Sequence, residues 1–194
     1  QALQAKLESL IQLFWTLGLT IGHSVRTIDE CLEESANDIT VQTSLLEARY
    51  ITGNRKLFQL MRERYNAQMN PSAFFIAKML ETRQRHVKFG DTPYSLEPNC
   101  KESPGGLRDL QVILWTAKAA KLGHSWNQLA RRGLLTPSEA QQLKKTEEAF
   151  KDIRIRLHIQ TQRCEDKLLF DVQIPVAKTF DFRENGQPLD SRRA

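Results

Sequence analysis

The sequence lacks the features of several common classes of protein. No apolar run approaches the roughly 18 residues that a membrane-spanning helix needs, and no signal-peptide pattern opens the chain. The three cysteines are odd in number and far apart, without the Cys-x-x-Cys spacing of a zinc or redox site. We therefore expect reduced thiols in a cytoplasmic protein, with no membrane among its partners.

Familiar catalytic motifs are absent as well. The chain has no Gly-x-Gly-x-x-Gly or Walker loop, no Gly-x-Ser-x-Gly elbow and no His-Glu-x-x-His pattern. It also lacks the Asp-x-Asp pair that holds two metal ions in many phosphoryl-transfer enzymes. The residues alone therefore assign no metal site.

Composition is that of an ordinary folded protein, with 40% hydrophobic and 26% charged residues in a chain of 194. This length suffices for one domain or two small ones. The net charge of +5 suits an anionic partner. Basic residues alternate with acids, however, and no aromatic residues interleave with a basic stripe, so we expect no nucleic acid among the partners.

Hydrophobic spacing predicts a mainly helical chain. Helical spacing begins at the N-terminus and recurs over residues 38–52 and 71–88, the second of these opened by Asn70-Pro71. Three capping boxes mark further helix starts, namely Thr27 with Glu30, Ser125 with Gln128, and Thr136 with Glu139. Residues 19–26 instead predict a short strand. The polar end, residues 184–194, predicts no regular structure, and both ends look like cuts through a longer protein.

The most informative segment is the glycine-rich stretch of residues 101–109, which opens a predicted helix. Backbone N–H groups at such a helix start, here those of Gly105 and Gly106, can hold a phosphate. Lys101 and Arg108 would add positive charge. A plain turn that joins two elements explains the same pattern, so the residues alone leave both interpretations open.

A second candidate lies at the end of the predicted strand. His23 stands between Gly22 and Ser24, with Arg26 close by in sequence. A neutral imidazole can orient a carboxylate, and an arginine can hold a phosphate through two hydrogen bonds. A purely structural role remains the alternative.

Several segments together resemble the family of bifunctional PII uridylyltransferase/uridylyl-removing enzymes. They occur in order between about residues 10 and 190: residues 22–27, 38–43, 47–49, 96–99 with 101–109, and 168–171 with 176–177. The resemblance implies transfer of UMP from UTP to a tyrosine of the PII nitrogen-regulatory protein, and its removal, under glutamine control. It also implies Mg²⁺ as cofactor.

The resemblance further implies a mainly α fold, in which a helical region is attached to a small α/β remnant of a polymerase-β-like nucleotidyltransferase domain. Residues 1–60 would be the end of that domain, residues 61–180 the helical domain, and residues 181–194 a polar linker. The main metal-binding acids would precede residue 1. A histidine–aspartate domain and the regulatory domains that respond to glutamine would follow residue 194.

For the site, the resemblance implies that Lys101, Gly105, Gly106 and Arg108 bind the triphosphate. Active-site support would come from His23, Ser24 and Arg26. Because no acid occurs from residue 16 to 26, either a third metal carboxylate comes from elsewhere, with Asp38 and Asp109 as candidates, or this member manages with two.

We expect this chain alone to be inactive, because it lacks the main metal-binding acids. Two alternatives stay open: a non-catalytic helical module that docks PII or relays regulation, and a protein like the glutamine synthetase adenylyltransferases, which carry a similar Gly-Gly-Ile-Arg segment.

Overall fold

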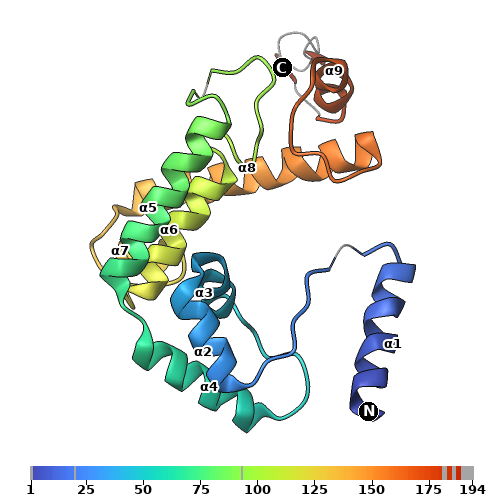
Figure 1. The fold of residues 1–194 in the computed structure, drawn as a ribbon. Coiled ribbons are helices and arrows are strands. Elements are labelled where there is room, and N and C mark those ends of the chain that lie inside the picture. Colours follow the sequence, from blue (N-terminus) through green and yellow to red (C-terminus); the bar gives the residue numbers. More distant parts are fainter. Residues whose placement is uncertain (1, 20, 93, 181–182, 185–186, 189–194) are drawn as a thin grey trace.

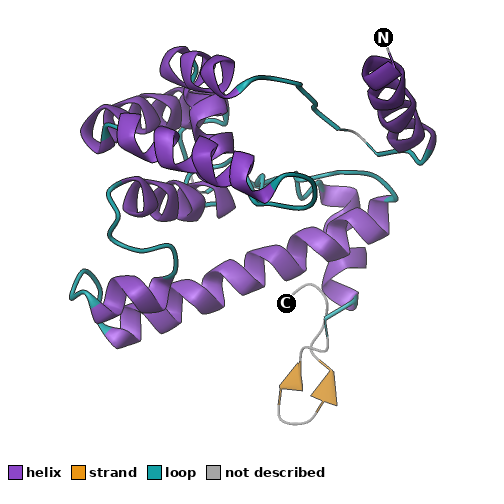
Figure 2. Ribbon diagram, turned by 90° about the horizontal axis from the view of Figure 1, so that it is seen from below, coloured by secondary structure: helices purple, strands orange, loops and turns teal. Residues whose placement is uncertain are grey.

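The computed structural model describes residues 2–19, 21–92, 94–180, 183–184 and 187–188. Of the predicted linker, residues 181–194, only 183–184 and 187–188 belong to the described residues. The described chain is mainly helical, as predicted (Figures 1 and 2). Its elements are α1 (Ala2–Thr16), α2 (Ile28–Asn37), α3 (Ile39–Leu46), α4 (Arg55–Gln68), α5 (Pro71–Lys88), α6 (Leu107–Ala119), α7 (Trp126–Arg131), α8 (Pro137–Thr161), α9 (Phe170–Lys178), β1 (Arg183–Glu184) and β2 (Gln187–Pro188).

Helices α5 and α6 pack side by side at the centre of the molecule (Figure 1). Helix α3 contacts both of them, and α2 packs against α3 and α4. The long α8 contacts α6, α7 and α9. Helix α1 stands apart from the other helices in both views. None of the described helices combines the length and apolar character needed to cross a bilayer.

Two core clusters lie along α6 and fix its position. Ala119 belongs to a cluster with residues of α2 to α5, among them Phe74, which is 1% exposed. Leu110 and Ala117 belong to a second cluster, with residues of α7 and α8. Because burial of large apolar side chains is the main favourable term in folding, these contacts hold the start of α6, and the loop before it, in one place.

Most predicted helix starts are confirmed. Thr27 and Thr136 form complete capping boxes, and Asn70 caps α5, which has the predicted bounds 71–88. Ser125 precedes α7, but its side chain makes no cap hydrogen bond, and the Gln128 side chain accepts from the His124 N–H and not from the Ser125 N–H.

Two predictions of local structure are wrong in part. The helix predicted for residues 38–52 ends at Leu46, and a separate α4, capped by Asn54, follows it. The polar tail contains the paired strands β1 and β2.

The strand predicted at residues 19–26 does not form. Residues 19 and 21–26 join no ladder among the described residues, and Leu19 and Val25 are 49% and 71% exposed. A strand is stable only when a neighbour pairs with its backbone groups, and no described segment pairs with this one. The structure therefore does not show the predicted α/β remnant.

Candidate functional site

The glycine-rich loop leads directly into α6, as predicted, and it needs glycine at two positions. Gly105 has φ +79°, a conformation that favours glycine. A Cβ atom on Gly106 would lie 2.9 Å from the Ser103 carbonyl oxygen and 3.0 Å from that of Lys101. The loop is thus folded tightly on its own carbonyl groups.

The amides of this helix start are engaged within the loop. The Gly105 N–H donates to Asp109 Oδ2 at 2.7 Å. The next four, Gly106 to Asp109, donate to the carbonyl oxygens of Ser103, Cys100, Lys101 and Gly106 at 2.9 to 3.1 Å. A phosphate here would therefore meet the side chains of Lys101 and Arg108, and the amide role of Gly105 and Gly106 stays a prediction.

Asp109 anchors the loop to α5. Arg85 donates to its Oδ1, and His86 Nε2 lies 3.0 Å from both of its oxygens. Burial raises the pKa of Asp109, but the hydrogen bonds from Arg85, the Gly105 amide and His86 outweigh it and hold that pKa below its usual range. The carboxylate is therefore ionised and occupied by protein donors.

Asp166, which the sequence analysis did not identify, anchors the other end of the loop. Arg154 and His158, one helical turn apart on α8, contact its Oδ1, and Lys101 Nζ lies 3.5 Å from Oδ2. Burial raises the pKa of Asp166, whereas the Arg154 and His158 hydrogen bonds lower it, with a net value below the usual range. The i,i+4 spacing of Arg154 and His158 was the one available signal for this contact. It did not reveal their partner, because Asp166 is distant from the glycine-rich loop in sequence.

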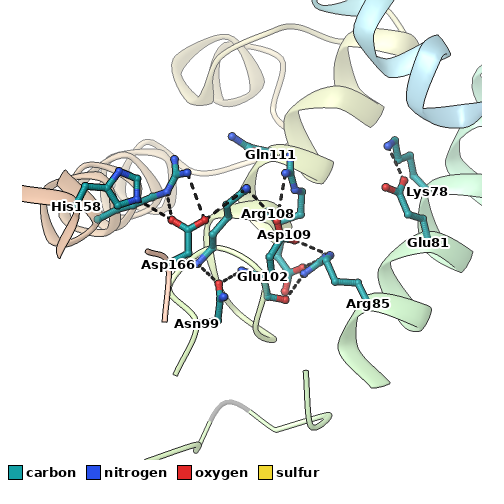
Figure 3. A network of polar contacts seen from close by, with 12 residues as sticks. Lys78, Glu81, Arg85, Asn99, Glu102, Arg108, Asp109, Gln111, His158 and Asp166 are labelled. Atoms are coloured by element: carbon teal, nitrogen blue, oxygen red, sulfur yellow. Dashed lines mark hydrogen bonds and ion pairs between the residues drawn. The ribbon is translucent and has the colours of Figure 1, made fainter. Parts of the chain in front are cut away.

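Glu102 joins the two anchors. Its Oε1 lies 3.3 Å from both Lys101 Nζ and Arg108 Nη2, and its Oε2 lies 3.8 Å from Arg85 Nε. Figure 3 shows the resulting chain of contacts from His158 on α8 to Arg85 on α5. We call this set the loop clasp: Arg85, Lys101, Arg108 and Arg154 against Glu102, Asp109 and Asp166, four basic and three acidic side chains.

A polar pocket of about 420 Å³ opens beside the loop clasp, between α3, α5 and α6. Volumes of this size suit small-molecule ligands. Residues of three segments that resemble one family, 38–43, 47–49 and 101–109, line it together. The lining residues are Thr40, Thr43, Ser44, Glu47, Lys78, Glu81, Arg85, Glu102, Arg108 and Trp115.

The three support residues lie elsewhere in this structure. His23 packs edge-on against Trp15 of α1, with ring centroids 5.9 Å apart. Arg26 pairs with Glu34 of α2 at 3.7 Å. Within the described part of the chain, no hydrogen bond or ion pair joins His23, Ser24 or Arg26 to the loop clasp, so their role in a site stays a prediction.

Asp38 caps α3. Its Oδ1 accepts hydrogen bonds from the amides of Thr40 at 2.6 Å and Val41 at 3.2 Å. These bonds hold the pKa of Asp38 below its usual range. In the described part of the chain, no group of three or more acidic, cysteine or histidine side chains is placed to hold a metal ion.

Asp38→Ala should therefore lower the free energy of unfolding, because it removes the N-cap of α3. Asp38→Asn should retain most of it, since asparagine also caps well. Urea unfolding of the two variants and the wild type measures this. Equal losses in both variants would indicate that the charge matters and not the cap.

Comparisons with known proteins agree on one family. A family model described as GlnD PII-uridylyltransferase matches residues 73–193. The chain is 59% identical over 189 residues to a bifunctional uridylyltransferase/uridylyl-removing enzyme of Cupriavidus pinatubonensis, covering 97% of this chain and 22% of that protein. It is 53% identical over 193 residues to the enzyme of the same description from Burkholderia orbicola, covering 100% and 22%.

The chain thus spans about a fifth of the length of the curated relatives it matches. No solved structure matches it.

Proposed function

Because the chain belongs to the GlnD PII-uridylyltransferase family, we propose that it supplies part of the nucleotide site of a cytoplasmic enzyme that transfers UMP from UTP to a tyrosine of PII and removes it under glutamine control. The observation that supports this proposal best is the polar pocket, which residues of α3 and of the glycine-rich loop line together. In this proposal residues 1–60 belong to a nucleotidyltransferase domain and residues 61–180 to a helical domain.

Lys101 and Arg108 have the chemistry to position a triphosphate. Arg108 presents a planar guanidinium, which suits phosphate oxygens, and it is held by Gln111 at 2.8 Å and Glu102 at 3.3 Å. The loop clasp has one more basic than acidic group, so a bound anion would balance its charge. Basic side chains that the protein already holds in place lower the entropic cost of orienting a substrate.

The described residues do not fit a Mg²⁺ site. Oδ1 of Asp38 and both oxygens of Asp109 accept hydrogen bonds from the protein, and no third ligand stands near either carboxylate among the described residues. The proposal therefore assigns this chain nucleotide positioning, and no step through the metal follows from it.

Separate titrations of the chain with Mg²⁺–UTP and with PII test the proposal. We expect UTP binding, observed by calorimetry, and its loss in the double variant Lys101→Ala with Arg108→Ala. Arg131→Ala with Arg132→Ala, two exposed arginines on and beside α7, is the matched control. Failure of the wild-type chain to bind UTP would count against the nucleotide role.

A non-catalytic module that docks PII is the second candidate function. The observation that favours it is the engagement of the loop amides by the loop itself, which leaves no free amide nest for a phosphate. Binding of PII without UTP would support this candidate.

A further inference from the structure

We propose that the polar pocket holds the base of the nucleotide, with Lys78 donating a hydrogen bond to a carbonyl oxygen of the base, while Lys101 and Arg108 hold the phosphates at the pocket edge. This inference rests on the proposed nucleotide site and adds the part of the ligand that the loop clasp does not explain.

The charge of the pocket lining favours a neutral group. Three basic side chains, Lys78, Arg85 and Arg108, are balanced by three acidic ones, Glu47, Glu81 and Glu102. A triphosphate inside the pocket would face these three carboxylates, and like charges at close range repel. A uracil ring is neutral and would leave the charges of the lining balanced. The base is therefore expected inside the pocket and the phosphates outside it.

Lys78 is the polar group best placed for such a ligand. Its side chain is 2% exposed, and its Nζ donates to Glu81 Oε2 at 2.6 Å. An ammonium group has three donors, and Glu81 is its one oxygen partner among the described residues. Its other charged or π contacts are with the rings of Trp115 and Phe74, so a carbonyl oxygen of a base would give the ammonium a second oxygen acceptor.

Acceptors for the base N–H stand on the opposite wall. The hydroxyls of Thr43 and Ser44 donate their own protons to carbonyl oxygens of α3, at 2.7 and 2.9 Å. Both residues line the pocket, and because each hydroxyl proton is already donated, its oxygen can serve a ligand only as an acceptor. Donor and acceptor walls together match the alternating C=O and N–H groups of a pyrimidine edge.

Trp115 links the base side to the phosphate side. Lys78 Nζ lies 4.9 Å from the centroid of its ring and Arg108 Cζ lies 5.4 Å from it. Both cations are thus held by one indole through cation–π contacts. Because Arg108 and Lys101 share Glu102 Oε1, the phosphate-binding side chains stand at the edge of the same pocket.

The test uses two probes, each representing one half of the nucleotide. Uridine binding is followed by saturation-transfer NMR of the base protons, and inorganic tripolyphosphate binding by ³¹P line broadening. We expect Lys78→Met to weaken uridine binding roughly tenfold or more, the loss of one charged hydrogen bond, without changing tripolyphosphate binding. Lys101→Ala should do the reverse. Lys88→Met, an exposed lysine on the same helix, is the control.

Ser44→Phe is the second variant, because Ser44 is exposed on α3 and a large ring there narrows the pocket without entering the core. Thermal unfolding verifies that each variant folds. If Lys78→Met does not fold, uridine binding by Ser44→Phe tests the inference. Uridine binding that survives Ser44→Phe overturns the inference. Tripolyphosphate binding without uridine binding overturns the inference and leaves the proposed function standing, whereas binding of neither probe overturns both.

Discussion

Arg108→Ala should lower UMP transfer by about 100-fold or more, the effect of removing one donor that stabilises transition-state charge, and leave UMP removal nearly unchanged. Negative charge develops on the departing pyrophosphate during transfer, and the fixed guanidinium of Arg108 would stabilise it. In the proposed function, removal would hydrolyse UMP from the tyrosine with no triphosphate present, so it would give Arg108 no such charge to stabilise.

The measurement requires a full-length relative in which this segment replaces the homologous one, because the chain spans about a fifth of such proteins. Transfer and removal are assayed on the same preparation. Arg108→Lys keeps the charge but loses the planar fork, so its transfer rate should fall between those of the wild type and Arg108→Ala. Arg132→Ala, an exposed arginine after α7, should change neither activity. Equal loss of transfer and removal in Arg108→Ala would show that Arg108 supports the fold alone.

Several helix starts were predictable because their signals are local. Thr136 with Glu139, and Asn70 before Pro71, determine helix starts through contacts within one turn. The strand predicted at residues 19–26 depends instead on a partner, and the sequence of a strand does not reveal whether one is present.

The candidate site was predictable in its loop and not in its anchors. The Gly-Gly pair indicated a tight turn before a helix, which Gly105 and Gly106 confirm. Asp166, His86 and Lys78 come from segments distant in sequence, and their pairing with the loop or the pocket follows from the packing of α5, α6 and α8. No local pattern identifies such tertiary partners.

Asp109→Ala should lower the free energy of unfolding by about 2 to 3 kcal/mol at neutral pH, less than a fully buried pair because the side chain is 22% exposed. The change leaves Arg85, which is 11% exposed, without its closest carboxylate, and leaves the Gly105 amide without its acceptor. Asp152→Ala, which breaks an exposed i,i+4 pair with Arg156 on α8, should cost only about 0.5 kcal/mol.

The pH dependence of this difference identifies its source. The folded-state pKa of Asp109 lies below its unfolded value, so its stabilising contribution is complete above about pH 4, the usual carboxyl range, and is lost as the pH falls through the folded pKa. Urea unfolding at neutral pH and at pH 3 should therefore show the wild type and Asp109→Ala converging in acid. A difference that does not change with pH would point to lost packing.

The same experiment separates a structural carboxylate from a catalytic one. Acids kept for metal binding or catalysis commonly cost stability, because their charge is held without protein partners, and their removal is often neutral or stabilising. Asp109 has hydrogen-bond partners on both oxygens, so we expect Asp109→Ala to lose stability. A gain in stability for Asp109→Ala without Mg²⁺ would instead favour the metal-ligand hypothesis and would require the loop to open before it binds nucleotide.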